Sequence, residues 1–141
     1  MIPIIGADYP KVLIPLLDGS RKNIDIVVYD WRWYSDQLMH PVQQFNMALV
    51  RAVHRGVVVR ALLNKPDILP TLQKVGIRAK QIRDRRTLHS KLVLIDGNTL
   101  VIGSHNFTRN AFAGNIETSI ALSVPLENSR FADFFNNLYN I

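Results

Sequence analysis

The sequence predicts an α/β protein with a mixed, largely parallel β-sheet flanked by helices, formed as one domain over residues 1–141. Two observations lead to this prediction. In the first half of the chain, apolar segments alternate with segments of helical periodicity, a pattern typical of parallel strands joined by crossover helices. In the second half, two apolar segments are separated only by residues 96–98, Asp-Gly-Asn, which favours an antiparallel hairpin. A sheet with both kinds of connection is mixed.

The chain opens with a helix, a strand and a second helix. Residues 8–20 have helical apolar spacing, although Pro15 interrupts it. Residues 23–29, NIDIVVY, indicate a buried strand. Residues 41–55 form the clearest helix, because their apolar side chains fall on one face and Gly56 follows as a stop signal.

The remaining elements continue the alternation and then depart from it. Strands are expected at 57–63 and 77–82, with a short helix at 66–75 between them. A hairpin strand follows at 99–103, and a closing helix is expected within 125–139. No internal repeat or linker divides the sequence.

Composition limits what the protein binds. The chain carries a formal net charge of +6 and a pI near 10.0, which favours an anionic partner, most simply nucleic acid, with a membrane surface as the alternative. It has no cysteine, so neither disulfides nor thiolate metal sites are expected.

No apolar run approaches the roughly 20 residues that span a bilayer, and we expect no stable membrane insertion. The N-terminal stretch carries Asp8 and Lys11 and does not resemble a signal peptide. A cytoplasmic location is expected, with export as the alternative for a trimmed chain.

Polar side chains interrupt the apolar segments of the hairpin. His89 and Lys91 lie two residues apart before the turn, and Ser104 and Asn106 have the same spacing after it. We expect His89 and Lys91 on a strand, so that each pair shares one face, because strand side chains alternate. The hairpin then brings both pairs close together in an otherwise apolar sheet. Polar groups in such a setting need partners or a chemical role.

This pattern resembles the signature of the phospholipase D superfamily, His-x-Lys-x4-Asp followed by Gly-Ser-x-Asn. The matching positions are His89, Lys91, Asp96, Gly103, Ser104 and Asn106. The Asn-x-Glu that often follows in the family is matched by Asn115 and Glu117, where a third strand is expected to begin. The match is specific because three elements occur in order at the family spacing. A short chain with one copy of the signature most resembles the bacterial endonuclease branch.

The resemblance implies a role for each matching residue. His89 would attack phosphorus and form a phosphohistidine intermediate. Lys91 and Asn106 would hold the phosphate oxygens, with help from Ser104, and Glu117 would orient the histidine. Asp96 is expected to be structural, like Gly103. The family fold is expected, and no metal or cofactor is required, because lysine supplies the positive charge.

The chemistry predicts that two chains meet at one site. Phosphodiester cleavage needs a nucleophile for phosphorus and an acid for the leaving oxygen, and one imidazole cannot serve as both in the same step. The chain holds one copy of the signature, so we expect a two-fold homodimer in which His89 of the partner subunit is the acid. The resemblance implies the same arrangement.

Further residues are candidates for binding nucleic acid: Arg83, Arg85, Arg86, Arg109, Trp31 and Arg32. The arginines either border a nucleic-acid groove or form a solvated charged face. The aromatic residues of the 31–34 loop either stack on bases or pack in the dimer interface. His40, His54 and His105 are interpreted as structural or surface residues.

These observations together predict a metal-independent phosphodiesterase, most simply a nuclease that cleaves DNA or RNA as a homodimer. Two alternatives remain. A phosphatidyl-transfer or phospholipase-type enzyme would be expected to show an interfacial apolar surface. A non-catalytic nucleic-acid-binding module would be expected to show a broken signature, whereas this signature is intact.

Overall fold

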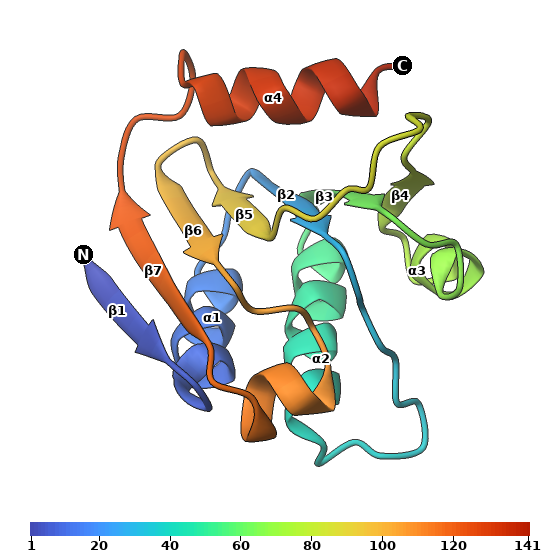
Figure 1. Cartoon of the computed structure of the whole chain (residues 1–141), viewed down its shortest axis with the longest axis vertical. Coiled ribbons are helices and arrows are strands. Elements are labelled where there is room, and N and C mark those ends of the chain that lie inside the picture. Colours follow the sequence, from blue (N-terminus) through green and yellow to red (C-terminus); the bar gives the residue numbers. More distant parts are fainter.

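One seven-stranded β-sheet runs through the computed structural model, which describes all 141 residues (Figure 1). Its order is β1-β7-β6-β5-β2-β3-β4. The strand bounds are β1 Ile2–Ile5, β2 Asn23–Val28, β3 Val58–Leu63, β4 Arg78–Gln81, β5 Leu92–Ile95, β6 Thr99–Gly103 and β7 Thr118–Ser123. The strands expected in the first half and the hairpin strand at 99–103 are therefore present, whereas β1 lies outside the predicted elements.

The sheet is mixed, but the expectation that it is largely parallel is wrong. Only β2–β3 and β3–β4 are parallel, whereas the other four of the six pairs are antiparallel. Crossover helices impose parallel pairing only where they join neighbouring strands. β5 reaches its place beside β2 through the irregular segment 82–91 and therefore runs in the opposite direction. β1 then adds a further antiparallel pair at the edge of the sheet, beside β7.

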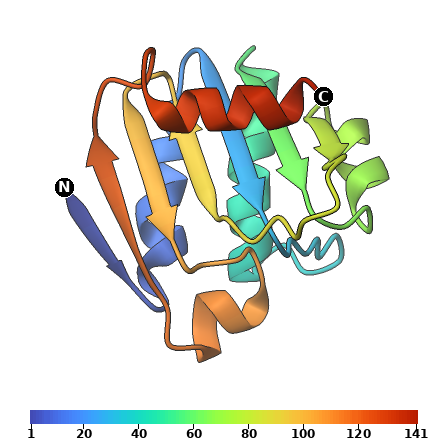
Figure 2. The ribbon, with the colours of Figure 1, turned by 45° about the horizontal axis from the view of Figure 1, so that its top comes forward.

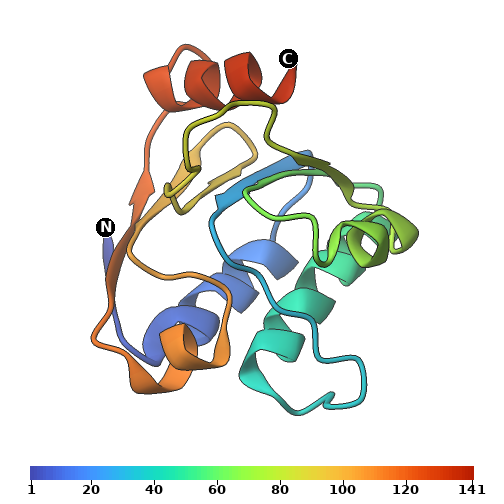
Figure 3. The same ribbon diagram turned by 45° about the vertical axis from the view of Figure 1, so that its right-hand side comes forward.

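Helices cover both faces of the sheet. Their bounds are α1 Asp8–Asp18, α2 Pro41–His54, α3 Leu69–Lys74 and α4 Arg130–Tyr139, with a single π-helical turn, η1, at Asn110–Gly114. α1 and α2 lie together on one face and α4 crosses the opposite face (Figures 2 and 3). The short α3 lies beside β4 (Figure 1). α2 starts and ends within one residue of the prediction, whereas α4 is shorter than the predicted 125–139.

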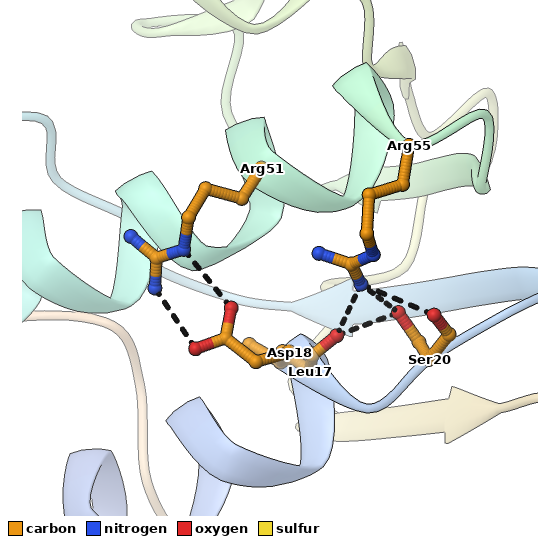
Figure 4. A network of polar contacts seen from close by, with 5 residues as sticks. All are labelled: Leu17, Asp18, Ser20, Arg51 and Arg55. Carbon is orange, nitrogen blue, oxygen red and sulfur yellow. Dashed lines mark hydrogen bonds and ion pairs between the residues drawn. The ribbon is translucent and has the colours of Figure 1, made fainter.

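The larger part of the core lies between the sheet and the α1–α2 pair. Fully buried side chains from both helices, including Leu13, Leu17, Phe45 and Leu49, pack there against β2. The helices are also joined at one end by polar contacts (Figure 4). Arg51 of α2 makes a bidentate ion pair with Asp18 of α1, and Arg55 donates to the carbonyl oxygens of Leu17 and Ser20 and to the Ser20 hydroxyl.

α4 closes a smaller apolar cluster on the other face. Phe135 and Tyr139 are buried there against leucines of the sheet, with their rings stacked at 5.3 Å. Phe131 and Phe134 of the same helix remain 40% and 37% exposed. The helix therefore has a second apolar surface that the chain itself does not cover. None of the helices combines the length and the hydropathy that a bilayer crossing demands.

Candidate active site

The predicted strand does not include the residues of the His-x-Lys motif. The alternation of side chains suggested a strand there, but β5 begins only at Leu92, after His89, Ser90 and Lys91. They form an extended segment directly before β5, and the Gly103 N–H donates to the Lys91 carbonyl at 3.4 Å. β6 ends at Gly103, so the segment before Lys91 has no partner strand and leaves the sheet. This release exposes the His89 side chain, while Lys91 remains only 9% exposed.

The Lys91 ammonium and the His89 imidazole are in contact. Lys91 Nζ lies 3.2 Å from both Nδ1 and Nε2 of the ring. An equidistant approach in the ring plane would clash with the Cε1–H between the two nitrogens, so the ammonium faces the ring. Burial lowers the pKa of Lys91 from its ordinary value, and the charge of Glu117 acts in the opposite direction. A partly desolvated cation therefore lies beside an exposed imidazole.

Tyr29 and Lys65 belong to this site, although neither was among the predicted site residues. The Tyr29 ring lies 5.3 Å from the His89 ring, and the ammonium groups of Lys91 and Lys65 lie 5.8 and 5.5 Å from the Tyr29 ring centroid. Tyr29 follows β2 and Lys65 follows β3, at the carboxyl ends of two parallel strands. Ligand sites collect at such ends, and this rule could have identified both residues from the sequence, although it was applied only to the 31–34 loop.

Asn106 is joined to the His89 side of the site through the backbone that follows β2. Its Oδ1 accepts from the Asp30 N–H at 3.0 Å, and Asp30 is the neighbour of Tyr29. The carbonyl of the Asn106 amide is thus fixed. Its Nδ2 donors have no acceptor within the chain and are available to an oxygen of a ligand.

Ser104 and Glu117 bind one another. The Ser104 hydroxyl donates to Glu117 Oε1 at 2.6 Å and accepts from the Thr118 N–H at 3.0 Å. Glu117 Oε2 accepts from Asn115 Nδ2 at 3.1 Å. Within one chain Glu117 therefore holds Ser104 and Asn115 and does not hydrogen-bond His89. Glu117 also precedes β7, which begins one residue later, so the third strand starts after the predicted Asn115.

Asp96 and Gly103 have structural surroundings. Asp96 Oδ1 accepts from the N–H groups of Lys22 and Asn23, and Oδ2 accepts from that of Arg21, so the carboxylate joins the β5–β6 turn to the start of β2. At Gly103 the backbone of β7 approaches so closely that a Cβ atom would overlap with atoms of Thr118 and Ser119. Glycine is therefore required at this position for the β6–β7 pairing.

The three arginines before His89 are exposed in the loop that leads to it. Arg86 forms a bidentate contact with Asp84, whose pKa is lowered by these hydrogen bonds. A cleft of about 440 Å³ lies between this loop and α4, and both Arg86 and His89 line it. Arg83 and Arg85 are exposed in the same loop and have no acidic partner.

Of the remaining candidates for nucleic-acid binding, Trp31 is buried, whereas Arg32 and Arg109 are exposed. Trp31 is only 5% exposed, donates from Nε1 to Asn46 at 2.8 Å and packs edge-on against Phe107, so the expectation that it stacks on bases or lies in an interface is wrong. Arg32 is half exposed and paired with Asp30, and Arg109 is exposed beside Tyr34.

His105 is fully buried as a packing residue. Its Nε2 lies 2.8 Å from the Gly6 carbonyl and its Nδ1 lies 2.7 Å from the Ser119 hydroxyl. A carbonyl only accepts, so Nε2 carries the proton and Nδ1 accepts from Ser119. Burial lowers the pKa of His105 and favours this neutral form.

The arrangement suits attack on a phosphodiester. An exposed imidazole is a nucleophile for phosphorus, and the Lys91 ammonium and the Asn106 amide are donors for charged phosphate oxygens. No three His, Cys, Asp or Glu side chains are grouped as ligands for a metal ion.

Comparison with known proteins gives a consistent family. Residues 13–139 match the family described as "Cardiolipin synthase, PLD-like domain". The chain is 33% identical over 131 residues to a mitochondrial cardiolipin hydrolase of Chlamydomonas reinhardtii, covering 89% of this chain and 55% of that protein. It is 28% identical over 131 residues to a phospholipase D of Rickettsia bellii, covering 89% and 59%. The chain thus spans little more than half the length of these curated relatives.

A solved structure shows the same fold. Nuc from Salmonella typhimurium, described as a phospholipase D family member, superimposes with a TM-score of 0.80 over 99% of this chain and 94% of that chain, at 20% identity. This likeness extends over the whole sheet and its flanking helices. Together with the match over residues 13–139, it confirms the resemblance inferred from the signature: the chain belongs to the phospholipase D-like family.

Proposed function

We propose that this protein is a metal-independent phosphodiesterase that cleaves DNA or RNA through a phosphohistidine intermediate, at a site formed by two chains. The observation that carries this proposal is the exposed His89 imidazole in contact with the buried Lys91 ammonium. A diester repels nucleophiles through its own negative charge, and a fixed cation beside the nucleophile offsets that repulsion.

In the first step, a ring nitrogen of His89 attacks phosphorus. The N–P bond forms as the bond from phosphorus to the leaving oxygen breaks, and that oxygen takes the electron pair. His89 of the partner subunit, in its imidazolium form, gives a proton to the leaving oxygen. Lys91 and the Asn106 Nδ2 group hold the non-bridging oxygens while negative charge builds up on them.

In the second step, water replaces the histidine. The now neutral His89 of the partner subunit takes a proton from water, whose oxygen attacks phosphorus. The N–P bond breaks and its electron pair returns to the His89 nitrogen. The products are a phosphate monoester and the free alcohol, and both histidines regain their starting protonation states.

The exposed face of α4 is the surface that we assign to the second copy. Phe131 and Phe134 line a groove of about 480 Å³ with Ser90 and Leu92, and Phe134 also lines the cleft beside His89. A second copy packed on this face across a two-fold axis would cover both rings and bring its own His89 to the same cleft. Exposed apolar surface and the need for a second imidazole thus favour the same contact.

Charge favours nucleic acid as the substrate. The net charge of +6 and the exposed arginines at 83, 85, 86 and 109 suit a polyanionic strand. A lipid phosphodiester is the second candidate, because curated relatives are named cardiolipin hydrolase and phospholipase D. A generic diester and both natural substrate classes therefore belong in the first assay.

The primary experiment measures hydrolysis of bis(p-nitrophenyl) phosphate, single-stranded DNA, RNA and cardiolipin vesicles in excess EDTA. Wild type is compared with His89→Ala, and His54→Ala serves as a control because His54 is exposed elsewhere, at the end of α2. We expect turnover of the diester and of nucleic acid that only His89→Ala abolishes, with phosphohistidine trapped by acid-free quenching. Turnover of cardiolipin without nucleic acid would overturn the nuclease assignment, and full activity of His89→Ala would overturn the mechanism.

The dimer is tested separately by analytical ultracentrifugation. Phe134→Asp places a charge on the exposed face of α4, and Leu38→Asp is the matched control, since Leu38 is 64% exposed in the loop before α2. We expect Phe134→Asp alone to give a folded monomer that has lost turnover. A monomeric wild type with full turnover would contradict the composite site.

A further inference from the structure

A polar cavity of about 330 Å³ adjoins the candidate active site and shares Asn106 with it. Tyr34 lines the cavity together with six polar residues: Asp30, Arg32, Thr108, Arg109, Asn110 and Asn115. The cleavage steps described above use only Asn106. A polar cavity that opens beside the reacting phosphate is placed to receive another part of the same substrate.

The charge in this cavity is not balanced. Arg32 is paired with Asp30, with Nε and Oδ1 3.1 Å apart. Arg109 has no acidic partner, and its guanidinium carbon lies 5.9 Å from the centroid of the Tyr34 ring. The cavity therefore holds one uncompensated positive charge, which favours an anion.

His40 and Tyr34 position Arg109 and leave the donors of its two terminal nitrogens free. The His40 and Tyr34 rings are stacked at 3.9 Å, and His40 Nδ1 accepts from the Val42 N–H, which caps α2. The Arg109 Nε–H also points at His40 Nε2 across 3.2 Å. A neutral imidazole accepts at one nitrogen only, so the Val42 N–H and the Arg109 Nε–H compete for the single acceptor of this ring. Burial and the charge of Arg109 both lower the pKa of His40, which keeps the ring neutral. The guanidinium thus lies against the His40 and Tyr34 rings through its Nε side, and the donors on Nη1 and Nη2 remain free.

The two residues that flank Arg109 in the chain also present polar side chains to the cavity. Thr108 Oγ1 accepts from the Ala111 N–H, which leaves the hydroxyl proton free to donate. The Asn110 side chain is exposed at the start of η1. These donors and Arg109 are consecutive in the chain, so one short segment presents a cationic fork with two neutral donors beside it.

We propose that the cavity is a second phosphate subsite, in which Arg109, assisted by Thr108 and Asn110, binds the phosphate next to the scissile one in a nucleic-acid strand. This inference rests on the proposed function and names its substrate class more closely. A strand whose reacting phosphate is held by Asn106 carries its neighbouring phosphate into the adjoining cavity. A substrate with one isolated phosphodiester leaves the subsite empty.

The first test compares two chromogenic substrates. One is thymidine 5′-(p-nitrophenyl phosphate), and the other is the same diester extended by one nucleotide on its 3′ side. Arg109→Gln is compared with Arg21→Gln, which removes the same charge at the opposite end of β2, where the Arg21 side chain has no partner. We expect Arg109→Gln to raise KM for the extended substrate about tenfold more than KM for the single diester. Equal KM ratios in the two variants would overturn the subsite.

The second test separates failure of the subsite from failure of the proposed function. Binding of a fluorescent single-stranded oligonucleotide is measured by anisotropy at several salt concentrations in the His89→Ala background. We expect Arg109→Gln to reduce the slope of log K against log salt by about 0.7, the value for one lost phosphate contact on a single strand, whereas Arg21→Gln leaves it unchanged. An unchanged slope in Arg109→Gln would refute the subsite. A reduced slope in Arg109→Gln, together with a wild type that hydrolyses no diester, would support the phosphate subsite while refuting the enzyme.

A third test asks whether the second phosphate belongs to a lipid, because cardiolipin also carries two phosphodiesters. Turnover of cardiolipin vesicles is compared with that of phosphatidylglycerol vesicles, whose lipid carries one. Selective loss of cardiolipin turnover in Arg109→Gln, with nucleic-acid turnover and binding intact, would overturn the nucleic-acid assignment of the subsite.

Discussion

Replacing Asp96 by alanine removes the acceptor that joins the β5–β6 turn to the start of β2. Three backbone N–H groups lose their partner, at distances of 2.9, 2.7 and 3.1 Å. These hydrogen bonds are exposed, so each contributes about 1 kcal/mol. Asp96 also has a φ of +54°, a conformation that costs alanine roughly 1 kcal/mol more than aspartate. The free energy of unfolding should fall by about 3 to 4 kcal/mol, a large part of the roughly 5 to 15 kcal/mol of a typical domain.

Two further variants separate the contributions. Asp96→Gly tolerates the positive φ but lacks the acceptor, so it should lose about 3 kcal/mol. Asp96→Asn keeps both the conformation and an Oδ1 acceptor for Lys22 and Asn23, and should lose about 1 kcal/mol. The free energy of unfolding is measured by urea denaturation. Hydrolysis of a small diester is then measured well below the transition.

The outcome decides whether Asp96 is structural. We expect each folded variant to retain a kcat within about twofold of wild type, because the carboxylate binds only backbone donors at the far end of β5 from His89. Full stability of Asp96→Asn together with loss of turnover would refute this reasoning and assign Asp96 to the chemistry.

Three further predictions concern Lys91, His105 and Trp31. Burial lowers the pKa of Lys91, so its charge and the activity that needs it should be lost at a pH below the ordinary value of 10.5, as a pH–rate profile would show. Lys91→Met should abolish turnover yet raise the free energy of unfolding by about 1 kcal/mol. A destabilised Lys91→Met would contradict the burial penalty. Burial also lowers the pKa of His105 below 6.5, so at acid pH the unfolded chain binds a proton that the folded protein does not, and stability should fall as pH drops through the His105 pKa of the folded protein. His105→Gln should weaken this acid dependence in urea titrations at pH 7 and pH 5. An identical dependence in His105→Gln would exclude His105 as its source. Trp31→Ala should cost about 3 to 5 kcal/mol of stability, while oligonucleotide affinity of the folded protein changes less than twofold; a loss of affinity without loss of stability would restore the stacking role.

The sequence by itself determined the local elements and the identity of the signature residues. α2 was predicted at 41–55 and is observed at Pro41–His54, because a one-sided apolar pattern and a following glycine are local properties of the chain. β6 matches its predicted range because the turn at 96–98 fixes where the hairpin strand begins. The spacing of His89, Lys91 and Asn106 identified the family, which the match over residues 13–139 shows.

Only the tertiary structure decided which strands pair and which polar groups meet. Local pattern does not encode a strand's partner, so β1 and the antiparallel β2–β5 pairing were not foreseen. For the same reason the sequence did not show that Glu117 binds Ser104, that Trp31 enters the core, or that Tyr29 and Lys65 reach the site. These contacts join residues far apart in the chain, and their geometry exists only after the sheet has assembled, because burial and strand register fix each side chain's neighbours.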